Sequence, residues 1–122
     1  MTSWIFKILR GPEWAEADNN ADYRGSPADQ QDGFIHFSTL DQLEGTLSKH
    51  FTDIDTCYLM VFHAADFAKG TMKWEPSRGG QLFPHLYAPL GVSIAKKTWK
   101  LDRKATGVFD LSSVQQWIQA ND

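Results

Sequence analysis

The segment Thr56–Phe62, with the sequence TCYLMVF, limits the possible folds more than any other part of the chain. Nearly all of its residues are apolar, at odd and even positions alike, so a strand built from it is buried on both faces. Such a strand belongs in the middle of a sheet that is covered on both sides. The chain has 122 residues, which suffices for one core of this kind, and we expect a single domain over residues 1–122.

Further extended segments are predicted on both sides of this central strand. They have the composition of strands and are bounded by turn formers: Trp4–Leu9, Gly33–Phe37, Thr71–Glu75 and residues 92–101. Residues Tyr23–Asp32 are polar and rich in turn-forming residues, so we expect a loop there. A helical turn is expected over residues 64–70. The order β-α-β-α-β, followed by short strands, indicates an α+β fold.

Three helices are predicted from capping signals and periodicity. Pro12 suits the first turn of a short helix over residues 12–19. Thr39 and Gln42 match the capping-box pattern that opens the next helix. The apolar residues of that helix recur at intervals of three and four: Leu40, Leu43, Leu47 and Phe51. A C-terminal helix is predicted over residues 112–120.

Charge and cysteine content exclude several classes of protein. The net charge of −3 argues against a general nucleic-acid or membrane-surface binder, which needs a basic face. No secretion signal opens the sequence, and no apolar run reaches the roughly 20 residues that span a bilayer. The single cysteine, Cys57, cannot form an internal disulfide and suits a reducing compartment, so we expect a cytoplasmic protein. The four histidines and Cys57 lack metal-ligand spacing, and no metal site is predicted.

The first candidate functional segment is Asp32–Thr39, DGFIHFST. Side chains alternate along a strand, so Phe34, His36 and Ser38 share one face while Ile35 and Phe37 take the other. A histidine in this position is either a core residue bonded to the backbone or a functional group, and the sequence leaves both readings open. Ser38 lies at a strand end before a helix, where a cap is more common than a nucleophile.

The second candidate segment is Trp74–Tyr87, WEPSRGGQLFPHLY, which resembles neither a regular helix nor a regular strand. Pro76 favours an extended backbone at Glu75, so Trp74 and Glu75 point to opposite faces. Arg78 is a planar, bidentate hydrogen-bond donor. The glycines that follow it can bring backbone N–H groups close to an anion: Gly79 and Gly80. We interpret the whole segment as pocket lining.

Two polar pairs at a spacing of two suggest a common cleft. His36 and Ser38 form the first pair, and His85 and Tyr87 form the second. If the two segments are neighbours, these side chains line one cleft together with Glu75 and Arg78; the alternative is a set of polar groups that are each satisfied independently. The HFST sequence also matches half of the H-x-[ST] pattern of two-histidine phosphoesterases, with HLYA as an incomplete second copy.

The sequence resembles domain-of-unknown-function family 952, a group of small, mainly bacterial proteins. The matching motifs occur in order over about residues 4–100: FKIL, EW, YRGSPAD, DGFIHFST, WEPSRGG and LFPHLY. The resemblance implies a fold similar to that of ADP-ribosyltransferases, which is a compact α+β domain with a split, mainly antiparallel sheet and flanking helices. It also implies that the cleft takes NAD or an ADP-ribose-like nucleotide, with NAD as a substrate rather than a fixed cofactor.

The family resemblance gives the candidate residues specific roles. His36 and Ser38 would hold a ribose or pyrophosphate, and Arg78 would pair with phosphate. Tyr87 would stack on a flat ring, and Trp74 is a further candidate ligand-binding residue. Glu75 or His85 would supply charge stabilisation or acid–base chemistry.

The candidate residues also depart from the transferase pattern. ADP-ribosyltransferases often use a late glutamate, and no glutamate follows Glu75 in this chain. Glu75 therefore either substitutes from another strand, or the protein binds a nucleotide without transferring ADP-ribose. A third option resembles the RNA 2′-phosphotransferase branch, with a set drawn from Arg24, Arg78, His36 and His85. Two other functions stay open: a non-catalytic module that binds a metabolite or peptide, and a two-histidine phosphoesterase or RNase that uses His36 and His85 as base and acid.

Overall fold

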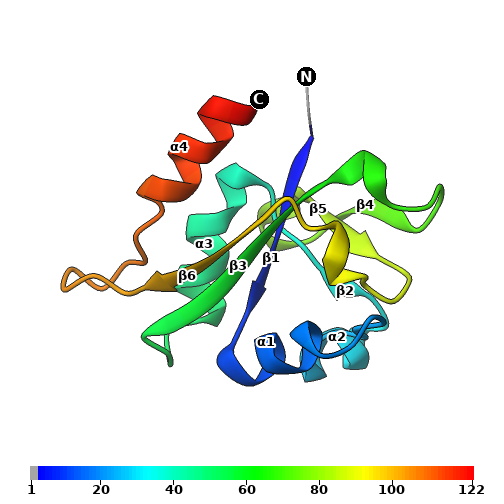
Figure 1. Cartoon of the computed structure of the whole chain (residues 1–122), viewed down its shortest axis with the longest axis horizontal. Helices are drawn as coiled ribbons and strands as arrows, with labels where there is room; N and C mark the ends of the chain where they lie inside the picture. The colour runs from blue at the N-terminus through cyan, green and yellow to red at the C-terminus, as the bar shows by residue number, and fades with distance from the viewer. Residues whose placement is uncertain (1–2) are drawn as a thin grey trace.

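The computed structural model describes residues 3–122, and its first sheet is built around the strand that was predicted to be central. β3 (Thr56–His63) lies between β1 (Trp4–Leu9) and β6 (Lys97–Asp102) and is antiparallel to both (Figure 1). The central position of β3 confirms the prediction made from its two apolar faces.

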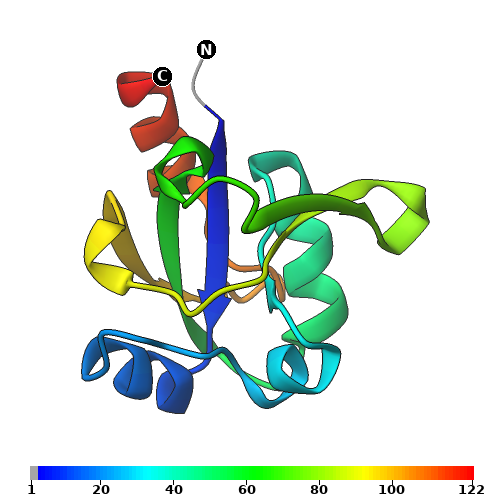
Figure 2. The same cartoon turned by 90° about the vertical axis from the view of Figure 1, so that its right-hand side faces the viewer.

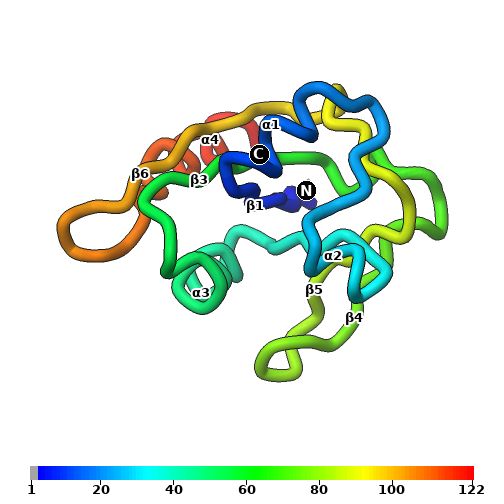
Figure 3. The backbone as a smooth tube through the Cα atoms, turned by 90° about the horizontal axis from the view of Figure 1, so that it is seen from below, coloured from blue at the N-terminus to red at the C-terminus, as the bar shows by residue number. Residues whose placement is uncertain are grey.

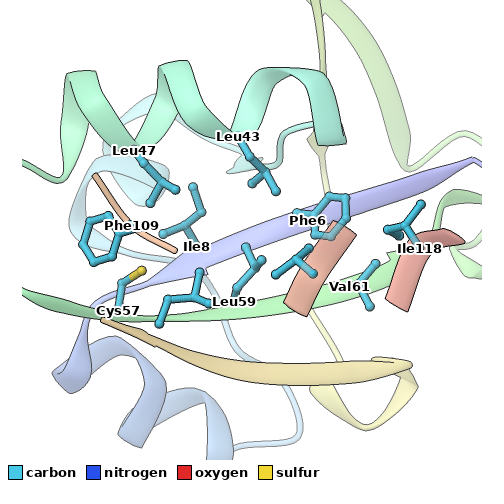
Figure 4. Packing of buried hydrophobic residues seen from close by; sticks show 11 residues of the cluster. Phe6, Ile8, Leu43, Leu47, Cys57, Leu59, Val61, Phe109 and Ile118 are labelled. Atoms are coloured by element: carbon cyan, nitrogen blue, oxygen red, sulfur yellow. The ribbon is translucent and has the colours of Figure 1, made fainter. Parts of the chain in front are cut away.

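Successive residues of β3 enter two different hydrophobic clusters. Cys57, Leu59 and Val61 face α3 (Leu40–His50) and α4 (Ser112–Asn121), as Figure 4 shows. On the other face, Met60 and Phe62 pack with residues of β1, of α1 (Gly11–Asp18) and of the second sheet: Ile5, Leu9, Ala17, Ile35 and Leu86. The first sheet is therefore a layer between two cores.

The second sheet is smaller and lies against one edge of the first. It has the order β2-β5-β4 and is antiparallel throughout, with β2 at Ile35–His36, β5 at Leu82–Leu86 and β4 at Met72–Pro76. Two backbone hydrogen bonds join it to β1: Phe6 N–H donates to Ser38 O (2.8 Å), and Ser38 N–H donates to Phe6 O (2.9 Å). Figure 2 shows the β4–β5 hairpin extending away from β1 on the side where α3 lies.

The helices begin and end close to their predicted positions. α1 carries Pro12 in its first turn, and Gln42 Oε1 of α3 accepts a hydrogen bond from Thr39 N–H at 3.0 Å. Seen from below in Figure 3, α3 and the β4–β5 hairpin lie on the same side of β1. No helix among residues 3–122 combines the length and the apolarity needed to cross a membrane. The predicted α+β class is confirmed, with two antiparallel three-stranded sheets and four helices in the part of the chain that the structure describes.

The prediction of a loop over Tyr23–Asp32 is wrong for its second half. Residues Pro27–Asp32 form α2, a short helix with proline in its first turn. Ser26 Oγ accepts a hydrogen bond from Asp29 N–H (3.1 Å), and Asp29 Oδ2 accepts one from Ser26 N–H (2.9 Å). This reciprocal cap explains why a polar, turn-rich sequence forms a helix here.

Three other segments are shorter than predicted. The strand expected over Gly33–Phe37 is limited to β2, because Gly33 and Phe34 donate their N–H groups to Asp29 O at the end of α2. Residues 92–101 begin with the 3-10 turn η3 (Val92–Ile94), and the strand β6 starts only at Lys97. In residues 64–70 the helical turn covers η1 (Ala64–Asp66).

The segment Trp74–Tyr87 forms most of a β-hairpin, so its description as neither helix nor strand is corrected. β4 and β5 pair in register, with Trp74 opposite Pro84 and Glu75 opposite Phe83. The turn η2 (Arg78–Gly80) connects them, and Ser77 N–H donates to Gln81 O at 2.9 Å. Gly79 and Gly80 both have positive φ angles (66° and 76°), a backbone conformation that favours glycine.

Candidate functional site

A cleft of about 700 Å³ opens beside the second sheet. Its walls come from β1, α2, α3 and the β4–β5 hairpin, so it lies where the two sheets and the two helices meet. Four of the predicted site residues line it: His36, Ser38, Arg78 and His85. This volume falls within the range of small-molecule sites, which is about 300–1,000 Å³.

The second sheet separates its polar side chains from its apolar ones. Ile35, Phe37 and Leu86 are buried in the core, as the alternation in DGFIHFST predicted. His36 and His85 are paired across β2 and β5, and their ring centroids are 5.5 Å apart. The two segments that carried the polar pairs in the sequence are therefore neighbouring strands.

His36 lies between two carboxylates. Its Nδ1 is 2.5 Å from Asp29 Oδ1, and its Nε2 is 3.0 Å from Asp32 Oδ2. Both acids come from α2, the helix that the sequence did not reveal. The backbone of His36 is also held, because its N–H donates to Asp29 Oδ1 (3.1 Å) and its carbonyl accepts from Lys7 Nζ (3.0 Å).

Asp29 is the buried centre of this network. Its Oδ2 accepts from Lys7 Nζ at 2.8 Å as well as from Ser26 N–H, so every lone-pair direction of the carboxylate has a donor. Burial alone would raise the pKa of Asp29, but the hydrogen bonds from His36 and Lys7 and the charge of Lys7 outweigh it and hold that pKa well below its usual range. Gly25, with φ of 99°, has no room for a Cβ, which would lie 2.5 Å from Asp29 Cβ.

His85 has a single carboxylate partner. Its Nδ1 donates to Glu75 Oε1 at 2.8 Å, and the Tyr87 hydroxyl donates to the same oxygen, also at 2.8 Å. Hydrogen bonds from His85 and then from Tyr87 lower the pKa of Glu75, and the hydrogen bond to Glu75 raises the pKa of Tyr87. Phe34 stacks on the His85 ring with centroids 4.0 Å apart, and this buried histidine lines the cleft.

Arg78 crosses from the hairpin to α3. Its Nη1 donates to Thr46 Oγ1 (3.2 Å), its Nη2 reaches Gln42 O (3.4 Å), and its guanidinium lies 5.0 Å from the centroid of Phe83. Among residues 3–122, no carboxylate forms an ion pair with Arg78. Gly45 makes room for it, since a Cβ there would lie 2.9 Å from Arg78 Nη2.

The lining of the cleft carries four basic side chains beside three carboxylates, although the chain as a whole is acidic: Lys7, Arg10, Lys49 and Arg78, with Glu13, Asp29 and Asp32. Burial and then the positive charges of Lys49, Arg78, His36 and Arg10 lower the pKa of His50, which lies at the edge of α3. Ser38 Oγ and Thr46 Oγ1 are 3.0 Å apart beside this charge and offer a pair of hydroxyls. The arrangement can hold an anionic group and supply two histidines for proton transfer.

Several predicted site residues lie outside the lining of the cleft. Glu75 and Tyr87 stand behind His85, on the same face of the second sheet. Trp74 is on the opposite face, and Gly79 and Gly80 form the hairpin turn. Gly80 N–H donates to Ser77 O (2.9 Å), so it is already used by the turn.

Other cleft residues were missed by the sequence analysis: Lys7, Asp29, Asp32, Thr46 and Lys49. One signal was available, because Ser26-Pro27-x-Asp29 is a capping box that places both acids of α2 on a helix. Lys7, the one charge in an otherwise apolar strand, was a second hint of a buried partner. Within residues 3–122, no group of three or more His, Cys, Asp or Glu side chains is arranged to hold a metal ion.

Comparisons with known proteins agree with the resemblance seen in the sequence. The family model described as "Protein of unknown function (DUF952)" matches residues 8–98. The crystal structure of protein CC0527 from Caulobacter crescentus is 38% identical, with a TM-score of 0.86 over 93% of this chain and 99% of that chain. The solution NMR structure of CC0527 gives 40% identity and a TM-score of 0.78 over 91% and 95%. No protein with a curated description matches. Because the family model covers most of the chain, this protein belongs to the DUF952 family.

Proposed function

We propose that this protein is a cytoplasmic nucleotide-binding protein whose cleft takes a phosphate-bearing ligand, NAD or an ADP-ribose-like molecule. One observation carries the proposal: Arg78 lines the cleft without a carboxylate partner among residues 3–122, close to hydroxyls and to two histidines that are each supported by a carboxylate. A half-buried guanidinium without a counterion is a typical phosphate ligand, because its planar fork matches phosphate oxygens.

The cleft residues divide between the parts of a nucleotide. Arg78 and Lys49 supply positive charge for phosphate, and Ser38 and Thr46 supply hydroxyls for a ribose. Tyr87 lies behind His85 and outside the cleft lining, so we assign it to the support of His85 through Glu75. Trp74 is on the other face of the second sheet and has no part in this arrangement.

The chemistry that these residues favour is proton transfer rather than stabilisation of a ribosyl cation. A transferase glutamate has to reach the nicotinamide ribose, but Glu75 Oε1 accepts hydrogen bonds from both His85 and Tyr87. Glu75 is therefore placed to orient His85. The likeness of the fold to ADP-ribosyltransferases stays a part of the proposal and implies the ligand class, while the transfer reaction receives less support from the position of Glu75.

Isothermal titration calorimetry tests the ligand class. NAD, ADP-ribose and adenosine 2′-monophosphate should each be titrated into the wild type, into Arg78→Gln and into Arg24→Gln, which removes the same charge outside the cleft lining. We expect saturable binding of at least one ligand, a loss of about tenfold or more in Arg78→Gln, and unchanged binding in Arg24→Gln. If no ligand binds the wild type at millimolar concentration, the proposal is wrong.

A second candidate function is cleavage of a phosphoester, and the 5.5 Å separation of the His36 and His85 rings favours it. His85 Nε2 would take the proton of an attacking hydroxyl while the new P–O bond forms. His36 would give a proton to the departing oxygen as the old P–O bond breaks, so the total number of protons on the two rings is unchanged.

Hydrolysis of a ribonucleoside 2′,3′-cyclic phosphate checks this second candidate. The rate should follow a bell-shaped pH profile, because one histidine has to be neutral while the other is protonated. Both His36→Ala and His85→Ala should abolish turnover. Saturable binding with no turnover in the wild type would instead assign a non-catalytic binding module.

A further inference from the structure

The two partners of His36 differ strongly in accessibility. The Asp29 side chain, at Nδ1, is 2% exposed, whereas the Asp32 side chain, at Nε2, is 51% exposed. The His36 side chain itself is 37% exposed and lines the cleft. One side of the ring is therefore anchored in the interior, and the other side meets its partner at the surface of the cleft.

The two contacts of the His36 ring also differ in kind. Nδ1 is hydrogen-bonded to Asp29 Oδ1, whereas Nε2 and Asp32 Oδ2 lie 3.0 Å apart, at the distance of an ion pair but without the geometry of a hydrogen bond. An ionised carboxylate only accepts hydrogen bonds, so another acceptor with more oxygens can take its place at Nε2. The cleft thus presents the Nε2 edge of His36, with the Asp32 carboxylate in front of it.

Replacing the contact between Asp32 and His36 by a contact with a ligand costs little free energy. Ion pairs between exposed groups contribute about 0.2–1 kcal/mol, because water screens the charges and holding the side chains costs entropy. Asp32 is also the last residue of α2, where the helix dipole favours a cation over a carboxylate. Asp29 is different, since it is buried and accepts hydrogen bonds from Lys7, Ser26 and His36.

We propose that the Asp32 carboxylate occupies the position beside His36 Nε2 where the terminal phosphate of the ligand binds. A phosphomonoester displaces this carboxylate when it binds. The proposal rests on the function proposed above and narrows its ligand class. Each phosphate of an internal diester, such as the pyrophosphate of NAD, carries one negative charge, as the carboxylate does, and gains little from the exchange. A phosphomonoester carries a charge of about −1.5 to −2 at pH 7 and three acceptor oxygens, which suits a cleft that also holds Arg78 and Lys49.

The test compares two variants that each remove one exposed negative charge. Asp32→Asn removes the proposed competitor, and Asp55→Asn removes a carboxylate that is 97% exposed and outside the cleft lining. Inorganic phosphate, adenosine 2′-monophosphate and NAD are titrated into the wild type and both variants, and the ring nitrogens of His36 are followed by ¹⁵N NMR.

We expect Asp32→Asn to bind phosphate and the monophosphate about two- to fivefold more tightly, which is the loss of one exposed ion pair. NAD binding should change less, and Asp55→Asn should match the wild type. In the wild type, phosphate should shift the Nε2 resonance of His36 more than the Nδ1 resonance.

Two results would overturn the inference. If NAD or the monophosphate binds saturably but Asp32→Asn binds phosphate no more tightly than the wild type, the exchange is wrong while the nucleotide-binding function stands. If no phosphate-containing probe binds the wild type or Asp32→Asn, both the exchange and the proposed function are wrong.

Discussion

The two sheets of this protein differ in how many of their faces are buried. In the first sheet, both faces of β3 are apolar and each is covered by a core. In the second sheet, one face closes a core through Ile35 and Leu86, and the other presents His36 and His85 next to a cleft. A sheet with a single buried face can carry polar groups on its free face, because the residues of the first sheet fill two hydrophobic clusters.

The buried carboxylate of the cleft should give the largest effect. Asp29→Asn leaves Lys7 without its counterion in the interior, and we expect a loss of about 3–5 kcal/mol in the free energy of unfolding. Asp32→Asn is the matched control, since it alters the other carboxylate of His36 at an exposed position and should cost less than about 1 kcal/mol. Urea denaturation measures both. Equal losses in the two variants would contradict the claim that the buried carboxylate of Asp29 stabilises the fold more than the exposed carboxylate of Asp32.

A pair of leucines compares the sheets directly. Leu59 of β3 is fully buried, whereas Leu82 of β5 is 52% exposed. Leu59→Ala should cost about 2–5 kcal/mol, because it leaves a cavity between packed layers. Leu82→Ala should change the free energy of unfolding by about 0.5 kcal/mol or less. Thermal and urea unfolding measure both variants. A loss of unfolding free energy in Leu82→Ala as large as that in Leu59→Ala would contradict the difference between the two sheets.

The pH dependence of stability should show part of the Asp29 contribution. The folded pKa of Asp29 lies below the unfolded value of about 3.9, so its stabilisation is complete above that pH and is lost as the pH falls toward the folded pKa. The gap in unfolding free energy between the wild type and Asp29→Asn should therefore narrow under acid conditions. A gap that widens as the pH falls would contradict the sign of this pKa shift.

The smallest effect on stability, with a measurable effect on binding, is expected at Gly45. Gly45→Ala improves helix propensity by up to about 1 kcal/mol. Its new Cβ displaces the flexible end of Arg78 from its contacts with α3. We expect stability to be unchanged or slightly higher and affinity for ADP-ribose or adenosine 2′-monophosphate to fall about tenfold. In the Arg78→Gln background, Gly45→Ala should cause no further loss. Additive losses would mean that Gly45→Ala does not act through Arg78.

Patterns that are local in sequence predicted two strands of the first sheet and the three longer helices well. β1, β3, α1, α3 and α4 follow from apolar periodicity and from caps within a few residues of one another. The strand predicted over Thr71–Glu75 corresponds to β4, but its pairing with β5 in a hairpin was missed, because Pro76, Pro84 and the central glycines conceal a period of two. The alternation is nevertheless present, with His85 and Tyr87 on one face and Leu86 on the other.

The sequence predicted some residues of the candidate site but not the partners that hold them. His36, Ser38, Arg78 and His85 were selected, and the structure brings them to one cleft. Their partners were not found, because the contact between Lys7 and Asp29 joins residues 22 positions apart and has no local pattern. The charge of the cleft likewise arises from side chains on several elements, and it is hidden in the net charge of −3.

The most direct test of a nucleotide cleft on the free face of the second sheet is an amide NMR titration with ADP-ribose and adenosine 2′-monophosphate. We expect saturable shifts at the amides around His36, Arg78 and His85, with little change along β6 and α4. Absence of saturable shifts at millimolar ligand, or shifts confined to β6 and α4, would contradict the account.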